Sequence, residues 1–554
     1  MPSGAELFAQ SMVQLGIRDL FTLVGDHLNE ALLAVSQAGI RIVDMRHESG
    51  VTHCADAWAR IHRRPAVSLV TGGPGHTNSL TGIATANLTG SPLIAVSGSP
   101  SLALSGRQVF QVIDQVSMTQ PAVKWSAGAT GAAEIPYLMG RAYNEANSGR
   151  KGAVHLTIPV NVFAAQTESA LPMPAPLAGA EAAPAVGQVE TALGMLFAAK
   201  RPIVVAGSGV WWGEAEAELA QFLRKTKLPL FTVTLARGVV ADTRANVFGY
   251  ADPAINKAAL AAFQEADVVL VLGKRLDYRL ALGGPRLFGK NAKVIQVDLH
   301  APELGAARSI DLGICADVKA TLRAMTKLAG EKTWQKLGDW TRKLSRDRRV
   351  YQATLDATAT KPQRPMHPAA LFSELRKALP ADTLYSWDGG DFVHWGRAMI
   401  PATQCGGWLR LGPMGTIGSA LPNCIALQLA NPGKPVVMIT GDGSLGFYLA
   451  ELETLVRYGL PVVIIVGNDG GWGLERELQM ELTGGKTVAC ELKHTRYDLI
   501  MQGFGGGGET VEKASEVAAA LKRAFASGKP YLLNAIVKGA RSPFTEWQIA
   551  GKKK

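Results

Sequence analysis

Short apolar runs of β type recur along this chain, and segments long enough to form helices separate them. The clearest runs fall into three groups, namely 42–44, 66–70 and 93–97, then 202–206, 268–272 and 294–298, and finally 436–440, 461–466 and 531–537. Alternation of this type is typical of parallel sheets covered by helices on both faces. It predicts an α/β fold of three doubly wound domains, with ligands at the carboxyl ends of the strands.

Length and linkers give the expected domain boundaries. At 554 residues the chain is too long for a single core. Residues 167–188 are rich in Ala and Pro and lack apolar periodicity, and residues 358–365 follow a charged, Trp-bearing helical stretch that starts near Thr333. We therefore expect domains at 1–166, 188–330 and 366–540, followed by a basic tail at 541–554.

Composition excludes several classes of protein. No apolar stretch reaches the length of a membrane span, and the N-terminus lacks a basic region followed by an apolar one. The five cysteines are scattered without CxxC spacing, so neither a disulfide framework nor a zinc site is expected. The cytosol is the expected location.

The net charge of +11 needs an explanation. Nucleic acid is not expected as a partner, because no basic run is interleaved with aromatic residues. A polyanionic small molecule, such as a coenzyme A thioester with its phosphates, would explain the charge. A plain basic surface would explain it equally well.

One segment predicts a metal and a diphosphate at the same place. Gly441-Asp442-Gly443-Ser444 follows the apolar run 436–440, and the glycines let backbone amides approach a phosphate. Asp442 offers a hard oxygen ligand, and Asp469, after the next run, offers a second. A backbone carbonyl near Gly471 is the expected third. Mg²⁺ held by these oxygens and completed by phosphate oxygens fits the pattern.

These residues resemble the thiamine diphosphate (ThDP) binding motif of the acetolactate synthase-like enzymes, which opens with GDG and closes about thirty residues later with NN or ND. The match runs without a gap from Gly441 to Asp469. Asp469 stands where the second Asn is usual, and its added charge is expected to tighten Mg²⁺ binding. The resemblance covers nearly the whole chain and implies pyrimidine-binding, central and diphosphate-binding domains. Cofactor contacts are implied for Gly441, Gly443, Ser444 and Leu474.

The resemblance also implies the residues that activate the cofactor. Glu48, shortly after the run 42–44, stands where the family keeps the carboxyl group that shifts the pyrimidine to its imino tautomer. Ile417, in a segment similar to the family's G-T-M-G-F-G-L-P, is the expected apolar wedge, with Gly415 beside it and Met414 ranked second. In 72–78, which resembles the turn that borders the pyrimidine pocket, Pro74 and Asn78 are implied cofactor contacts.

Three polar residues are expected near the reacting carbon. His27 falls where benzaldehyde lyase-like members carry a substrate-facing histidine, and Gln111 matches the family's phenylalanine–glutamine loop. Either could instead be an ordinary loop residue. Glu475 stands at the offset of a proton-shuttling glutamate in decarboxylases of the superfamily. An ion pair with Arg476 or Lys493 is the alternative for Glu475.

The central segment suggests the substrate. Residues 273–278 and 296–298 resemble the acyl-CoA-using branch of the family, whose middle domain holds ADP or the adenine end of CoA. There Asp298 suits a ribose hydroxyl, and Lys274 and Arg275 suit phosphate. The tail resembles that of bacterial 2-hydroxyacyl-CoA lyases, in which it is expected to fold over the thioester so that Arg541 meets CoA phosphates.

The predicted function is that of a ThDP- and Mg²⁺-dependent 2-hydroxyacyl-CoA lyase, which forms formyl-CoA and an aldehyde or ketone and also runs in reverse. The alternatives are a benzaldehyde lyase-like or acetolactate-type carboligase, an oxalyl-CoA decarboxylase, and a non-catalytic ADP sensor. ADP as a bound activator is left open. By resemblance, different subunits hold the two ends of one cofactor, so a homodimer is the minimum and a homotetramer is expected.

Overall fold

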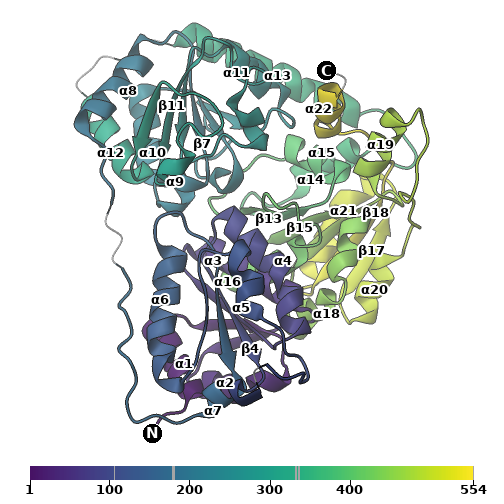
Figure 1. The fold of residues 1–554 in the computed structure, drawn as a ribbon. Coiled ribbons are helices and arrows are strands. Elements are labelled where there is room, and N and C mark those ends of the chain that lie inside the picture. Colours follow the sequence, from purple (N-terminus) through teal and green to yellow (C-terminus); the bar gives the residue numbers. More distant parts are fainter. Residues whose placement is uncertain (105, 178–180, 331–333, 335–336, 553–554) are drawn as a thin grey trace. The chain divides into compact units, whose positions relative to one another are not determined.

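The computed structural model describes residues 1–554 except 105, 178–180, 331–333, 335–336 and 553–554. It contains three six-stranded sheets flanked by helices (Figure 1). Neighbouring strands in the described parts of all three sheets pair in parallel. The predicted α/β fold with three doubly wound sheets is confirmed.

The chain forms two compact units. The first contains residues 1–179, 411–433 and 446–460, and the second contains 180–410, 434–445 and 461–554. The first unit thus includes two stretches that the sequence analysis had placed in the third domain. Each unit is described below by itself.

The first unit is built on one sheet with the order β2-β1-β3-β4-β6-β5. Its strands are β1 (Asp19–Thr22), β2 (Arg41–Asp44), β3 (Ala66–Val70), β4 (Leu93–Ser99), β5 (Ser126–Gly128) and β6 (Val154–Pro159). Its helices are α1 (Gly4–Gln14), α2 (Asn29–Gln37), α3 (Glu48–His62), α4 (Pro74–Thr89), α5 (Gln115–Thr119), α6 (Ile135–Asn147), α7 (Val160–Ala164), α16 (Ala420–Ala430) and α18 (Glu451–Arg457). Helices α1, α2 and α6 share a buried core with β1, β3, β4 and β6, whereas α3 packs on α4 and α16 (Figure 1).

The second unit carries the other two sheets. The central sheet has the order β12-β11-β10-β7-β8-β9. Its strands are β7 (Pro202–Ala206), β8 (Leu230–Thr232), β9 (Val247–Tyr250), β10 (Val268–Leu272), β11 (Lys293–Asp298) and β12 (Leu312–Cys315). Its helices are α8 (Val186–Ala198), α9 (Ser208–Trp212), α10 (Glu216–Thr226), α11 (Lys257–Glu265), α12 (Val318–Ala329) and α13 (Gly338–Ala359).

The third sheet has the order β14-β13-β15-β16-β18-β17. Its strands are β13 (Leu384–Asp388), β14 (Trp408–Arg410), β15 (Val436–Gly441), β16 (Val463–Asn468), β17 (Gly507–Val511) and β18 (Tyr531–Ile536). Its helices are α14 (Pro368–Ala378), α15 (Asp391–Met399), α17 (Asp442–Leu445), α19 (Gly473–Leu482), α20 (Tyr497–Gly503), α21 (Val517–Ala526) and α22 (Pro543–Lys552). One buried apolar cluster runs through this sheet and the central one.

Strand order predicts where ligands bind. In each sheet the chain first adds strands on one side of the starting strand and then crosses to the other, so a crevice opens at the reversal. The reversals fall between β1 and β3, between β7 and β10, and between β13 and β15. Three candidate residues lie at these points: His27 at the first, Lys274 at the second and Asp442 at the third.

Several boundaries differ from the sequence-based ones. The first linker ends earlier than expected, because α8 begins at Val186. The helical stretch before the second linker begins at Gly338, and Thr333 lies outside the described residues. The basic tail forms helix α22, whereas Lys553 and Lys554 are also outside the described residues. No helix within the described parts of the chain combines the length and the apolar character that crossing a membrane requires.

Candidate functional site

Glu48 lies at the position predicted for a catalytic carboxyl group. It is the first residue of α3, which His47 caps by accepting a hydrogen bond from the Ser49 amide at 3.1 Å. The Asn78 side-chain amide donates to Glu48 Oε2 at 3.0 Å. The structure thus brings together two predicted site residues from α3 and α4. Among the described residues, this hydrogen bond uses Oε2, and no hydrogen bond uses Oε1.

The turn before α4 is held by a residue that the sequence analysis passed over. Gly73 has a φ of +63° and precedes Pro74, the first residue of α4. The buried Gln115 accepts from the Gly73 amide at 3.2 Å and donates to the Gly98 carbonyl at 3.1 Å. A Cβ at Gly73 would come within 2.9 Å of Gln111 Cβ, so Gln111 lies against this turn. Gln115, the first residue of α5, follows Gln111 by four residues. This second glutamine is the sequence signal that could have identified Gln115 as a residue of this turn.

His27 is buried at the reversal between β1 and β3. Its Nδ1 accepts from the Gly72 amide at 3.3 Å and lies 2.9 Å from the Thr71 hydroxyl. A backbone donor on Nδ1 places the proton of the neutral ring on Nε2. Burial lowers the pKa of His27, against a smaller opposing effect of Asp26. The ring is therefore neutral at pH 7 and offers an Nε2–H donor.

The predicted wedge lies on the loop before α16, in the first unit. Thr416 Oγ1 lies 2.8 Å from Thr85 Oγ1, which ties this loop to α4. Ile417 is half-buried, whereas Met414 is 46% exposed. Gly415 has a φ of +73° with open space around its missing side chain. The lower exposure of Ile417 is consistent with ranking it above Met414 as the wedge. The role of either residue as the wedge stays a prediction.

The two predicted metal ligands lie at the ends of neighbouring strands of the second unit. Asp442 is the first residue of α17, directly after β15, and Asp469 follows the last residue of β16. The Gly471 amide donates to Asp442 Oδ2 at 3.1 Å. Among the described residues, no group of three or more His, Cys, Asp or Glu side chains could hold a metal. A cation here therefore needs backbone and phosphate oxygens as well.

The electrostatics of this pair fit a divalent cation. Burial raises the pKa of Asp442 to about 6, against opposing hydrogen bonds from backbone amides such as those of Gly443 and Gly471. Burial and then the Asp442 charge raise the pKa of Asp469 to about 7, although Arg476 opposes the shift. Two carboxylates that destabilise each other's charge are stabilised by a cation between them. The residues present thus fit Mg²⁺ with a diphosphate.

Glycines keep the reversal between β13 and β15 open. Gly389 has a φ of +111°, and a Cβ there would come within 3.1 Å of the Gly441 amide nitrogen and 3.3 Å of Ser444 Oγ. A Cβ at Gly443 would meet the Trp472 ring at 2.8 Å. The predicted diphosphate contacts Gly441, Gly443 and Ser444 therefore lie where the backbone can approach a phosphate.

The helix after the metal loop carries two predicted residues. Leu474 packs on Gly390, where a Cβ would come within 2.7 Å of the leucine Cβ. Glu475 is exposed, and it has no ion pair within the described part of the chain. Arg476 instead pairs with Asp469 at 2.6 Å and Glu491 at 3.4 Å. The alternative expected for Glu475, an ion pair with Arg476 or Lys493, is therefore absent among the described residues.

The predicted adenine-binding residues lie at the reversal between β7 and β10. Lys274 is 4% exposed and forms an ion pair with Asp277, so a carboxylate inside the protein already balances its charge. Arg275 lies 3.9 Å from Glu303. Asp298 accepts from the His300 amide at 3.0 Å, and burial raises the pKa of its carboxyl group. Arg275 and Asp298 thus suit a nucleotide better than Lys274 does.

The C-terminal segment packs on helices of the second unit that begin close to Asp469. Arg541 donates to Glu477 at 2.8 Å and to Glu481 at 3.1 Å, both on α19. Helix α22 packs on α15 and α19. The buried Asp391, at the start of α15, accepts from the Ser542 amide at 3.1 Å. Asp391 was not among the predicted site residues, because only the fold brings it close to Asp469. Arg476 was considered only as a partner of Glu475, although it lies seven residues from Asp469.

Comparison with known families covers all three sheets. Residues 2–118 match the N-terminal TPP binding domain of thiamine pyrophosphate enzymes, residues 189–325 match their central domain, and residues 388–535 match their C-terminal TPP binding domain. Thiamine pyrophosphate is another name for thiamine diphosphate. The family predicted from the Gly441–Asp469 motif is therefore confirmed.

Similar proteins span nearly the full length. A probable acetolactate synthase of Mycobacterium bovis is 35% identical over 96% of this chain and 95% of its own length. The 2-hydroxyacyl-CoA lyase 1 of Mus musculus is 29% identical over 97% and 94%. A sulfoacetaldehyde acetyltransferase of Castellaniella defragrans is 29% identical over 94% and 90%. The three names describe three different activities.

Proposed function

Because this chain belongs to the thiamine diphosphate-dependent enzymes, we propose that it is a carbon–carbon lyase acting on 2-hydroxyacyl-CoA thioesters. The products are formyl-CoA and an aldehyde or ketone, and the reverse reaction joins the same pair. The proposal includes Mg²⁺ as the bound metal. A homodimer is the minimal assembly, a homotetramer the expected one, and the cytosol the location.

The observation that carries the choice of a CoA thioester is the placement of the basic C-terminal segment. Helix α22 packs on α15 and α19, whose first residues lie beside Asp469. Arg541 is 37% exposed at this place, so a phosphate can compete with Glu477 and Glu481 for its guanidinium. Full-length similarity to 2-hydroxyacyl-CoA lyases from mouse and rice, at 29% and 30% identity, adds support.

Each residue at the site has a defined task. When bound, ThDP supplies a nucleophilic carbon that attacks the carbonyl group and accepts the electrons of the broken bond. Glu48 uses Oε1 to hold a proton at the cofactor's pyrimidine ring. His27 donates from Nε2 to a substrate oxygen, so it orients the substrate in the tautomer that the Gly72 amide selects. The exposed Glu475 would take the 2-hydroxyl proton through water as the carbon–carbon bond breaks, and would return it to the carbon that becomes the formyl group of formyl-CoA. This assigns the base role to Glu475 rather than His27.

The test incubates the protein, ThDP and Mg²⁺ with formyl-CoA and either formaldehyde or acetone, and identifies thioesters by mass spectrometry. A 2-hydroxyacyl-CoA product supports the proposal. Glu48→Gln is expected to abolish turnover with an unchanged circular dichroism spectrum, whereas Glu30→Gln, on the exposed face of α2, keeps full activity. Turnover retained by Glu48→Gln contradicts the role of Glu48.

A second candidate is an acetolactate-type carboligase acting on free 2-oxoacids. The internal ion pair of the buried Lys274 favours it, because this cation has a carboxylate partner without a CoA phosphate. The relative named as a probable acetolactate synthase, at 35% identity, points the same way. Acetolactate from pyruvate, with no thioester product in a parallel reaction, would establish this candidate and reject the lyase.

A further inference from the structure

The metal loop carries one more charge than the motif it resembles, and an arginine faces that charge. We propose that Arg476 is a positioning residue that offsets the charge of Asp469, occupies its Oδ2 and leaves Oδ1 for the metal. The proposal rests on the metal-ligand roles of Asp442 and Asp469 in the proposed function. It assigns Arg476 to the Mg²⁺–diphosphate site without a direct contact to either group.

The contact geometry supports this division of the two oxygens. Arg476 Nη2 lies 2.6 Å from Asp469 Oδ2. Within the described residues, Arg476 is the one side chain that hydrogen-bonds to the Asp469 carboxylate. The pair is mostly buried, at 15% and 13% exposure, so water screens it weakly. A guanidinium held on one oxygen fixes the orientation of the other.

Three glycines surround this ion pair. A Cβ at Gly471 would come within 2.6 Å of Arg476 Nη1, and one at Gly473 within 2.7 Å of Asp469 Oδ2. A Cβ at Gly539 would overlap Arg476 Nη2 and lie 3.1 Å from Asp469 Oδ2. The backbone on three sides therefore leaves room for the pair only because side chains are missing. Such a fit is not expected of an incidental surface ion pair.

A second segment fixes Arg476 from its other side. Gly471 and Glu491 form an antiparallel bridge, and the Trp472 amide donates to the Cys490 carbonyl at 2.7 Å. Glu491, on this segment, lies 3.4 Å from Arg476 Nη1 and is 64% exposed. Because the exposed Glu491 is well screened, its pull on the guanidinium is weaker than that of Asp469. Arg476 is thus anchored toward the metal loop.

Charge balance gives the reason for the pair. Asp442 and Asp469 carry two negative charges when ionised, and together with Arg476 these three side chains have a net charge of −1. A motif with one Asp and one Asn has the same net charge. Without Arg476, two buried carboxylates would repel the diphosphate that must bind with the metal. Arg476 thereby makes Asp469 compatible with a diphosphate ligand.

The experiment is a double-mutant cycle on the full-length protein. The Mg²⁺-dependent affinity for ThDP is measured by calorimetry, and tryptophan emission gives a second readout, since Trp472 packs on Gly443. Asp469→Asn leaves Arg476 with the exposed Glu491 as its carboxylate partner among the described residues, so its charge repels Mg²⁺ and about a tenfold or larger loss of affinity is expected. Arg476→Gln weakens ThDP binding through diphosphate repulsion. The double variant is expected to recover to within about threefold of the wild type.

Two further variants control for the fold. Arg476→Lys keeps the charge and is expected to retain most of the affinity. Arg523→Gln removes an exposed partner of Glu509 in the same unit. It is expected to leave the Mg²⁺-dependent affinity for ThDP unchanged. Additive losses in the double variant, with all circular dichroism spectra unchanged, would overturn the role of Arg476.

Asp442→Ala separates this inference from the proposed function. If Asp442→Ala leaves Mg²⁺-dependent ThDP binding intact, the metal site itself is misassigned and both proposals fail. If it abolishes binding while the Asp469–Arg476 cycle is additive, only the inference about Arg476 fails.

Discussion

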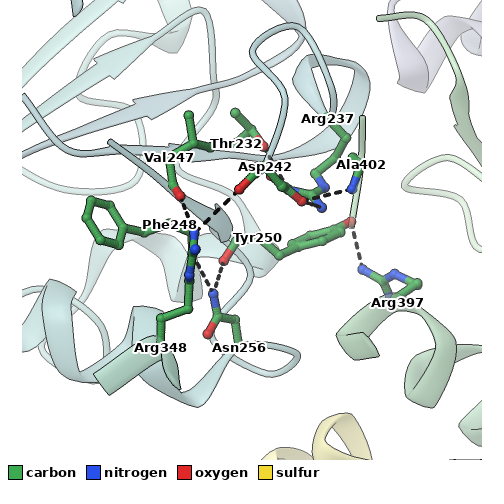
Figure 2. Close-up of polar contacts among 10 residues, drawn as sticks. All are labelled: Thr232, Arg237, Asp242, Val247, Phe248, Tyr250, Asn256, Arg348, Arg397 and Ala402. Atoms are coloured by element: carbon green, nitrogen blue, oxygen red, sulfur yellow. Dashed lines mark hydrogen bonds and ion pairs between the residues drawn. The ribbon is translucent and has the colours of Figure 1, made fainter. Parts of the chain in front are cut away.

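Two buried arginine–aspartate pairs of the second unit use their carboxylate oxygens in different ways. In the first, Asp242 Oδ1 accepts from Arg237 at 2.9 Å, and Oδ2 accepts from the same guanidinium and from the Ala402 amide at 2.9 Å (Figure 2). We call it the closed pair. In the second, Asp469 Oδ2 accepts a hydrogen bond from Arg476, and no side chain within the described residues donates a hydrogen bond to Oδ1. We call it the open pair.

The closed pair joins parts of the fold. Arg237 also donates to Thr232 at 2.9 Å, and its guanidinium lies over the rings of Tyr250 and Trp408 at 4.7 and 5.1 Å. Tyr250 in turn accepts from Arg397 at 2.8 Å (Figure 2). Burial alone would raise the pKa of Tyr250, but Arg397, Arg410 and Arg279 lower it to about 8. This network connects the central sheet with α15 and the loop before β14.

The difference shows how one pair of residue types serves either structure or ligand binding. A carboxylate with both oxygens hydrogen-bonded inside the protein contributes rigidity. A carboxylate with one oxygen left, beside a second carboxylate, has a place for a cation. Burial alone does not separate the two cases, because all four side chains are mostly buried.

The largest expected effect is in the closed pair. Asp242→Ala leaves the Arg237 guanidinium buried without its counter-ion, so the free energy of unfolding should fall by about 3–5 kcal/mol. Urea unfolding followed by circular dichroism measures this. Asp242→Asn, which keeps an acceptor, should lose less. A loss below about 1 kcal/mol for Asp242→Ala would show that the pair is not structural.

The carboxyl groups of Asp442 and Asp469 should make the stability of the protein depend on pH. The folded-state pKa values of Asp442 and Asp469, about 6 and 7, lie above the ordinary value of 3.8. Between these values the folded state holds more protons than the unfolded state, so stability falls as pH rises from about 4 to above 7. Thermal unfolding without ligands should shift down by several degrees, and Mg²⁺ with ThDP should remove most of the shift. A melting temperature that rises over this range would contradict the assignment.

Crowding the open pair should have an intermediate effect. Gly539→Ala places a methyl group against Arg476 and Asp469, so it should cost about 1–3 kcal/mol of stability and weaken Mg²⁺-dependent ThDP binding. Gly194→Ala is the control, since its Cβ would meet nothing within 4 Å in α8 and should add up to about 1 kcal/mol. Calorimetry and thermal unfolding of both variants test this. Equal behaviour of the two variants would show that the space around the pair is not limiting.

The smallest effect is expected for an exposed pair. Arg523 and Glu509 lie 2.6 Å apart with 56% and 25% exposure. Arg523→Gln should change the free energy of unfolding by less than about 1 kcal/mol, because water and salt screen the pair. Unfolding in 0.05 and 0.5 M NaCl measures it. A loss comparable to that of Asp242→Ala would remove the distinction between buried and exposed pairs.

Local signals in the sequence located much of the candidate site. The apolar run before Gly441 predicted β15, and the carboxyl ends of β15 and β16 place Asp442 and Asp469 at one edge of a sheet. Glu48 could be placed at a helix start because the chain turns there directly after β2. Short, low-periodicity strands such as β5, β8 and β12 were missed, since few residues carry too little pattern to identify a strand.

The sequence by itself determined the fold class, the cofactor family and the residues that could bind a metal, because these depend on patterns within short stretches of chain. Only the tertiary structure decided which carboxylate oxygens of those residues are hydrogen-bonded inside the protein and which remain for a ligand. Arg476 lies seven residues from Asp469, whereas Gly539 contacts both of them, and Gln115 contacts Gly73, across much longer stretches of sequence. Lys274 and Arg541, chosen as phosphate ligands for their charge, proved to have carboxylate partners. Charge is a property of the residue, whereas its availability depends on neighbours that only folding brings together.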